Sequence, residues 1–279
     1  MRVHHLNCGT MRPLGGPLVN REGGRFAARM VCHCLLLDTG SQLVLVDTGL
    51  GVPDVSTRIA QLGSGWRRLV RPDLDVAETA VAQVRHLGYR SEDVRHVVLT
   101  HLDRDHAGGL VDFPNAQVHV HETEHAAMLR DVGARRYLPH QFEHGPQFRI
   151  VPDSSAGEDW FGFQAVRDIP GLPQDVVLVP LAGHTRGHTG VAVRTERGWL
   201  LHAGDAFFDH REIGVRDRCP AGLRVFRSVM HADGAQRRHN LQRVRELAAA
   251  RSDEVQVLCS HDAAQFDGKR PDIRVRATS

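Results

Sequence analysis

The sequence is poor in aromatic residues and contains no long hydrophobic run. Its 279 residues include 10 Phe, 3 Trp and 2 Tyr, which argues against an aromatic platform for stacking bases or sugars. The 35 Lys and Arg residues nearly balance the 33 Asp and Glu residues, so there is no electrostatic footprint for nucleic acid. No segment reaches the ~18 uncharged apolar residues of a membrane span. We therefore expect a small-molecule substrate, no nucleic-acid or membrane partner, and a homodimer as one option for assembly.

Cysteine is also scarce and irregularly spaced. Five cysteines without a repeating interval do not make a disulfide framework, and Cys32 and Cys34 are too close for a CxxC motif. We expect reduced thiols, mostly buried in strands, in a cytoplasmic protein. The N-terminus lacks the apolar segment of a secretory signal. No repeat or linker divides the chain, so we expect a single domain over residues 1–279.

Hydrophobic periodicity predicts a layered fold in which strands and helices alternate. Apolar runs at 31–37 and 43–46 flank the sequence Asp-Thr-Gly-Ser and predict a hairpin. Helical spacing is found at 75–87, 122–130 and 236–250. Further strands are expected at 94–100, 117–120, 175–181, 190–194, 199–203 and 255–259. This order is typical of an α/β or α+β fold, with polar residues at the strand ends.

Histidine is the residue in excess, since the 19 histidines outnumber all aromatic residues together. Four side chains that commonly bind metals follow the predicted strand 94–100, namely His101, Asp103, Asp105 and His106. Imidazole and carboxylate ligands together suit zinc, iron or manganese. The alternative is that these residues cap the next helix. Gly108 and Gly109 allow the backbone to turn close to such a site.

Three later segments repeat the arrangement of a strand followed by a candidate ligand. The sequence GHTRGHTG, which contains His184 and His188, follows one predicted strand. Asp205 follows another strand, and His261 follows the last. A single histidine after a strand is more often structural or exposed. Together with the first motif, the four segments indicate one metal centre.

In this order and spacing, the motifs resemble those of the metallo-β-lactamase-fold hydrolase superfamily. The family signature HxHxDH, GHTxGH, Gly-Asp and a late His appears here as HLDRDH, GHTRGH, AGDAFF and CSHD. The early turn Asp47-Thr48-Gly49 also matches, and the likeness runs from about residue 30 to about residue 265. The resemblance implies an αββα sandwich, in which two mixed sheets flanked by helices carry a two-metal site at one edge.

The resemblance also implies a role for each residue of the motifs. One metal would be bound by His101, Asp103 and His184, and the other by Asp105, His106 and His261. Asp205 would bridge the two metals. Asp105 and Asp205 would take part in catalysis, and Asp105 is a candidate proton acceptor. Asp47 and His188 would orient ligands rather than bind metal.

Asp103 departs from the family pattern, which has a histidine at this position. A carboxylate makes the first metal position harder and more negative, which favours iron or manganese over zinc. The flavodiiron variant of the fold carries a glutamate here, but nothing in this chain resembles a flavin domain. We expect two divalent ions, with zinc as the first choice and iron or manganese as alternatives. A mononuclear site is the other option.

The sequence says less about the substrate. The motifs are most similar to those of single-domain lactonases, which have a tyrosine where this chain has Phe208. Arg104 lies between two candidate ligands and would suit an anionic group, or it would be a surface residue paired with an acid. Tyr137 lies in the segment 133–145, a candidate pocket loop. The basic segments 66–68 and 135–137 are expected in loops, as solvated faces or as substrate contacts, and His202 is a further pocket candidate.

The resemblance implies a metal-dependent hydrolase. A metal-bridging hydroxide would attack a small ester or lactone. One alternative is a phosphoesterase for a small anionic substrate, favoured if Arg104 faces the pocket. Another is a non-hydrolytic diiron sensor or redox protein, which metal analysis would separate from the hydrolases.

Overall fold

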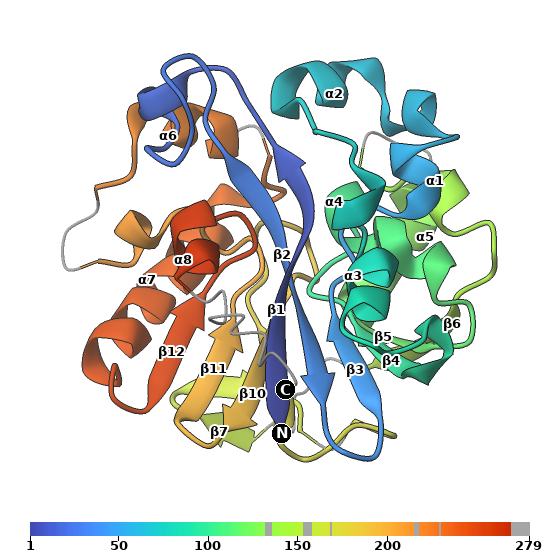
Figure 1. The fold of residues 1–279 in the computed structure, drawn as a ribbon. Helices are drawn as coiled ribbons and strands as arrows, with labels where there is room; N and C mark the ends of the chain where they lie inside the picture. Colours follow the sequence, from blue (N-terminus) through green and yellow to red (C-terminus); the bar gives the residue numbers. More distant parts are fainter. Residues whose placement is uncertain (132–135, 153–157, 168, 215–217, 229, 269–279) are drawn as a thin grey trace, which may run out of the picture.

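In the computed structural model, two mixed β-sheets face each other and helices cover their outer faces (Figure 1). The structure describes residues 1–131, 136–152, 158–167, 169–214, 218–228 and 230–268. The first sheet has the order β1-β2-β3-β4-β5-β6. Its strands are β1 (Arg2–Met11), β2 (Met30–Asp38), β3 (Leu43–Val46), β4 (Val94–Val98), β5 (Gln117–His121) and β6 (Gln147–Val151). Neighbours are antiparallel from β1 to β3 and parallel from β3 to β6.

The second sheet has the order β12-β11-β10-β9. Its strands are β9 (Val176–Pro180), β10 (Thr189–Thr195), β11 (Gly198–His202) and β12 (Val255–Leu258). Only β11 and β12 are parallel in this sheet. A small hairpin of β7 (Glu158–Trp160) and β8 (Phe163–Ala165) adjoins it through a bridge between Val166 and Leu178. Both large sheets are mixed, as the resemblance implied.

The helices lie on the outer sides of the two sheets. They are α1 (Val52–Val55), α2 (Ser64–Val70), α3 (Ala80–His86), α4 (Arg104–Ala107), α5 (Glu122–Asp131), α6 (Ala221–Ser228), α7 (Gly234–Ala250) and α8 (Ala263–Asp267). Short 3-10 turns are η1 (Gly16–Leu18), η2 (Ile59–Leu62), η3 (Val76–Glu78), η4 (Ser91–Asp93), η5 (Gly108–Asp112), η6 (Pro139–Gln141) and η7 (His210–Glu212). In Figure 1, α3 to α5 lie beside β3 to β6, and α7 and α8 lie beside β12. Within the described residues, no helix has both the length and the apolar character to cross a membrane.

The core is divided into layers because side chains alternate along each strand. On β2, Leu35 and Leu37 face the second sheet, where they join a cluster with Leu178. Leu36 belongs to the cluster on the helix side of the first sheet. A strand buried on both faces reads as a continuous apolar run, which explains the pattern at 31–37. On the far side, Leu241 and Val244 of α7 pack against the outer face of the second sheet.

The predicted α/β architecture and the hairpin of β2 and β3 are confirmed. The five cysteines are free and buried, also as predicted. The helix predicted over 75–87 is in fact two elements, because Thr79 has extended backbone and caps α3 by accepting from the Ala82 amide at 3.4 Å. The prediction of a loop at 66–68 is wrong, since these residues lie in α2. The strands β1 and β6 were not predicted.

Candidate metal centre

The candidate ligands meet where strands of both sheets end. Strands β3 and β4 are parallel, and Asp47 and His101 follow them. Strands β11 and β12 are also parallel, and Asp205 and His261 follow them. Because parallel neighbours end on the same edge of a sheet, each sheet brings two polar segments together. His184 joins them from the turn between β9 and β10.

Asp205 lies between two groups of potential ligands. His101, His184 and Asp205 form one group, and His106, His261 and Asp205 form the other, with the ligand atoms of each group within 4.8 Å of one another. Asp205 Oδ2 lies 3.4 Å from His184 Nε2 and 3.1 Å from His261 Nε2. Its other oxygen lies 3.4 Å from His106 Nε2. This is the position that the resemblance implies for a bridging carboxylate.

Asp103 and Asp105 approach this cluster from opposite sides. Asp103 Oδ2 is 3.0 Å from His184 Nε2 and 3.5 Å from His101 Nε2. Asp105 Oδ2 is 3.7 Å from His261 Nε2. The structure thus brings all seven candidate ligands to one place, with Asp103 on the His184 side and Asp105 on the His261 side.

The donor atoms of the cluster fit divalent cations. Nε2 of His101 and of His106, and Oδ1 of Asp103 and of Asp205, are buried without a hydrogen-bond partner in the described part of the chain. Leaving buried polar atoms unpaired is costly, so atoms of this kind indicate a missing partner. Imidazole nitrogens and carboxylate oxygens are the ligands of zinc, iron and manganese. The residues present therefore fit two such ions.

Hydrogen bonds on the far ring nitrogens turn three histidines toward the centre. His261 Nδ1 donates to the Val31 carbonyl at 2.8 Å, and His106 Nδ1 donates to Asp47 at 2.9 Å. His101 Nδ1 lies 3.0 Å from the Thr100 hydroxyl. A donor hydrogen on Nδ1 leaves the lone pair on Nε2, which faces the cluster.

Asp47 and His188 lie behind the cluster, in orienting positions. Asp47, in a left-handed backbone conformation (φ 56°), also accepts from the amide and hydroxyl of Thr100, each at 2.8 Å. His188 Nδ1 donates to the Leu181 carbonyl at 3.0 Å, and its Nε2 accepts from the Asp205 amide at 2.9 Å. Both nitrogens of His188 are thereby occupied. Its ring fixes the backbone of Asp205, and Gly204 (φ 53°) leaves room for it, because a Cβ there would lie 2.5 Å from Nε2.

Charge interactions inside the cluster shift several pKa values. Burial raises the pKa of Asp205, but the charges of His261, His106 and His184 outweigh burial and hold it well below its usual range. Burial disfavours charged His106, but Asp205 and Asp47 hold its pKa well above the ordinary value. The pKa of His184 falls to about 4, mainly because of burial. Anionic carboxylates beside neutral His184 are what metal binding requires.

Glu124 is a structural partner of the motifs that sequence reasoning missed. Its side chain, fully buried at the start of α5, accepts from the amides of Leu102 at 3.0 Å and Gly187 at 3.1 Å. These amides belong to the HLDRDH and GHTRGH segments, so one carboxylate joins both ligand loops. The available signal was its spacing, since Glu124 shares the buried face of α5 with Ala127 and Met128.

The substrate candidates are placed very differently. Phe208 stacks on the His261 ring at 5.3 Å and meets His184 edge-on at 5.9 Å, so it lies against the centre. Arg104 is buried, donates to the Leu62 carbonyl and lies over the Trp66 ring.

Two further candidates also have internal partners. The Tyr137 hydroxyl donates to Glu124 at 3.1 Å. His202 donates to the His33 carbonyl at 2.6 Å.

The basic segment 135–137 reaches the centre through its second residue. Arg135 lies outside the described residues, whereas Arg136 Nη1 is 2.5 Å from Asp103 Oδ2. The thiol of Cys32, which the sequence indicated only as a buried cysteine, lies near Asp105 and His261. A further group of Asp209, His210 and Asp262 has other partners: Arg211 pairs with Asp209, and Asp262 caps α8.

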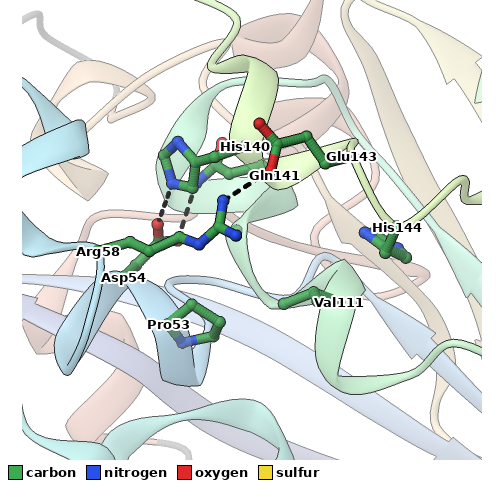
Figure 2. Close-up of a pocket in the computed structure, with 9 residues that line it drawn as sticks. Pro53, Asp54, Arg58, Val111, His140, Gln141, Glu143 and His144 are labelled. Atoms are coloured by element: carbon green, nitrogen blue, oxygen red, sulfur yellow. Dashed lines mark hydrogen bonds and ion pairs between the residues drawn. The ribbon is translucent and has the colours of Figure 1, made fainter.

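A separate cavity of about 280 Å³ lies between α1, η5 and η6 (Figure 2). At its floor the buried Asp54 carboxylate is 2.7 Å from His140 Nε2 and accepts from Gln141 at 2.8 Å. Figure 2 shows Arg58 reaching across to Glu143, with which it forms an ion pair of 2.7 Å. None of the expected metal ligands lines this cavity, and it is distinct from the metal centre.

Comparison with known proteins agrees with this geometry. Residues 28–261 match the family described as the metallo-beta-lactamase superfamily. A Mycobacterium tuberculosis protein named "Probable metallo-hydrolase Rv2300c" is 40% identical over 267 residues, which cover 94% of this chain and 80% of that protein. The N-acyl homoserine lactonase AiiA of Bacillus thuringiensis subsp. kurstaki is 27% identical over 178 residues, 63% of each chain.

A solved structure shows a similar fold. An N-acyl homoserine lactone hydrolase with the product N-hexanoyl-L-homoserine bound at its catalytic metal center superposes with a TM-score of 0.72. That structure shares 20% sequence identity and covers 96% of both chains. The chain thus belongs to the metallo-β-lactamase superfamily of metallohydrolases.

Proposed function

We propose that this protein hydrolyses a small ester or lactone at a centre of two divalent metal ions. The observation that carries the proposal is the Asp205 carboxylate, which lies within 3.4 Å of candidate ligands of both groups: His184 in one, and His106 and His261 in the other. In this proposal one ion would be held by His101, Asp103 and His184, the other by Asp105, His106 and His261, and Asp205 would be a ligand shared by both. Zinc is the first choice for the metal, with iron and manganese as the alternatives.

When bound, the metal pair supplies a water of lowered pKa and an electrophile for the substrate carbonyl. Residues of the chain would transfer the proton, orient the ligands and contact the substrate. Asp105 is only partly buried, and its carboxylate faces His261, so it is placed to accept a proton and pass it to the leaving oxygen. Asp47 and His188 keep the ligands oriented, and the ring of Phe208 forms an apolar wall beside His261.

Support for a lactone comes from the relatives that are lactonases by name and from this apolar wall. An uncharged cyclic ester with an acyl chain would lie against Phe208 without burying an unpaired polar group. Phe208 has no hydroxyl and cannot polarise the substrate carbonyl. In this proposal the metal centre alone would polarise the carbonyl of a lactone.

A phosphoesterase is the second candidate, and Arg136 favours it. Its guanidinium lies within the cluster, on Asp103, where it could meet an anionic oxygen of a phosphate ester. Arg104, which would have favoured this function, is instead held by Leu62 and Trp66.

The test combines metal analysis with substrate screening. The purified protein should contain about two equivalents of metal and hydrolyse a lactone, ester, thioester or phosphoester from a panel. Asp205→Ala and His184→Ala should lose metal and activity together, whereas His86→Ala, an exposed histidine on α3, should keep both. A fully metallated and active Asp205→Ala protein would refute the proposed centre.

A further inference from the structure

Arg136 is held by atoms that the proposed metal centre needs for itself. Its Nη1 donates to Asp103 Oδ2 at 2.5 Å and to His184 Nε2 at 3.2 Å. Its Nη2 donates to the Met230 carbonyl. Two of the three acceptors of this guanidinium are therefore expected ligands of the first metal position.

The same two atoms also lie within hydrogen-bond distance of each other. Asp103 Oδ2 and His184 Nε2 are 3.0 Å apart. In the tautomer with hydrogen on Nδ1, His184 Nε2 and Asp103 Oδ2 are both acceptors, and a cation beside them is favourable. The guanidinium lies against both, and a divalent ion at the first metal position would do the same.

The negative charge of Asp103 explains why a guanidinium lies here. A histidine at this position would be neutral, but Asp103 adds a negative charge to a buried site. A buried carboxylate needs a nearby positive charge or several hydrogen bonds. Arg136 supplies this charge beside Asp103 Oδ2, while Asp103 Oδ1 is buried without a hydrogen-bond partner in the described residues.

We propose that Arg136 is an internal counter-cation of the first metal position. Its guanidinium pairs with Asp103 and His184 when this position holds no metal, and it leaves Asp103 Oδ2 and His184 Nε2 when a divalent ion binds. The first position then binds metal more weakly than the second, because the ion must displace an existing ion pair. This inference rests on the metal centre proposed above and assigns Arg136 a role in setting its affinity.

The test is a double-mutant cycle on metal affinity in the full-length apoprotein. Zn²⁺ would be titrated against a chromophoric chelator for the wild type, Arg136→Met, Asp103→His and the double variant. Arg136→Met removes the competing charge, so it should lower the larger of the two Zn²⁺ dissociation constants. The decrease is about tenfold if the ion pair contributes about 1.4 kcal/mol. In the Asp103→His background, Arg136→Met should change that constant less than twofold, since the pair is already absent.

Two further measurements separate this role from a structural one. Arg136→Met should lower the Tm of the apoprotein and enlarge the rise in Tm on adding Zn²⁺, whereas loss of a purely structural contact would lower both Tm values. Arg136→Lys, which keeps the charge, should retain the wild-type affinity. Co²⁺ spectra recorded at one equivalent should report the second position, because it fills first.

Each outcome decides between the two proposals. Equal tightening in both backgrounds, or unchanged or weaker binding in Arg136→Met, would overturn the counter-cation role while leaving the metal centre intact. A wild-type protein that binds no Zn²⁺ would overturn the metal centre and this inference together.

Discussion

Glu124 should stabilise the protein far more than an ordinary glutamate, because it joins both ligand loops. The carboxylate is fully buried and accepts from the Leu102 amide, the Gly187 amide and the Tyr137 hydroxyl. Replacing Glu124 with Ala leaves these three donors without an acceptor. At about 1–3 kcal/mol for each of the three buried donors, the expected loss is about 3–9 kcal/mol. That is a large share of the roughly 5–15 kcal/mol that stabilises a typical protein.

The isosteric change Glu124→Gln should destabilise the protein less than Glu124→Ala. The amide keeps one oxygen, but its NH₂ group must face at least one of the present donors. The expected loss is therefore smaller, about 2 kcal/mol. With a shift of about 2–4 °C per kcal/mol for a domain of this size, Tm should fall by roughly 4–8 °C in Glu124→Gln and further in Glu124→Ala.

Urea and thermal unfolding of the apoproteins would measure these losses, with Glu92→Gln, an exposed glutamate on η4, as the control. The loops that Glu124 holds carry His101, Asp103 and His184, so metal affinity should fall as well. If Glu124→Gln unfolds at the same temperature and urea concentration as Glu92→Gln, the three hydrogen bonds do not stabilise the fold and the reasoning is wrong.

Three more predictions follow from particular contacts. Phe208→Tyr adds a hydroxyl to the ring stacked on His261 and should raise turnover of a lactone substrate; unchanged turnover would mean that this hydroxyl does not reach the carbonyl. Gly187→Ala should destabilise the protein by about 1–3 kcal/mol, because its Cβ would lie 2.1 Å from the Glu124 amide nitrogen, while Gly65→Ala, with open space around it, should not. Burial and the neighbouring His96 lower the pKa of His119 to about 4; the neutral ring then contributes stability above about pH 6.5 that is lost as the pH falls toward 4, and an NMR titration giving a pKa near 6.5 would contradict this.

The candidate ligands could be picked out in the sequence because each lies next to a local pattern. Each follows a recognisable strand, and the fold only has to bring the strand ends to one edge. The helix and strand patterns that surround them, such as β2 and α7, are buried on predictable faces. The same local signals explain why the architecture was predicted correctly.

Strand β1 escaped prediction because its pairing and its polar residues obscure the alternation. Its register with β2 shifts between Asn7 and Thr10, which breaks the two-residue period. Both residues are buried and bond to Glu78, at 3.4 Å and 2.7 Å. A strand that buries polar side chains against a distant glutamate has no clear hydrophobic pattern to read.

The buried partners of Glu124 and Arg136 could not be predicted, for a related reason. A charged residue in a sequence is expected at the surface, and only its partners reveal that it is buried. The donors to Glu124 and the acceptors of Arg136 come from segments far away in the chain. The helical spacing of Glu124 indicates a buried position, but neither composition nor periodicity identifies the partners of these two residues.

The partner of Asp103 acts on how tightly the first position binds metal, rather than on which metal this position prefers. Taken alone, a carboxylate in place of an imidazole makes the first position more negative and shifts its preference from zinc toward iron or manganese. In the folded protein Arg136 lies 2.5 Å from that carboxylate and adds a positive charge beside it. In the inference above, this guanidinium leaves Asp103 when a divalent ion binds, so the metal-bound centre keeps the negative charge of the carboxylate. The preference for iron or manganese over zinc should therefore keep its full size, while Arg136 lowers the affinity of the first position for all three ions.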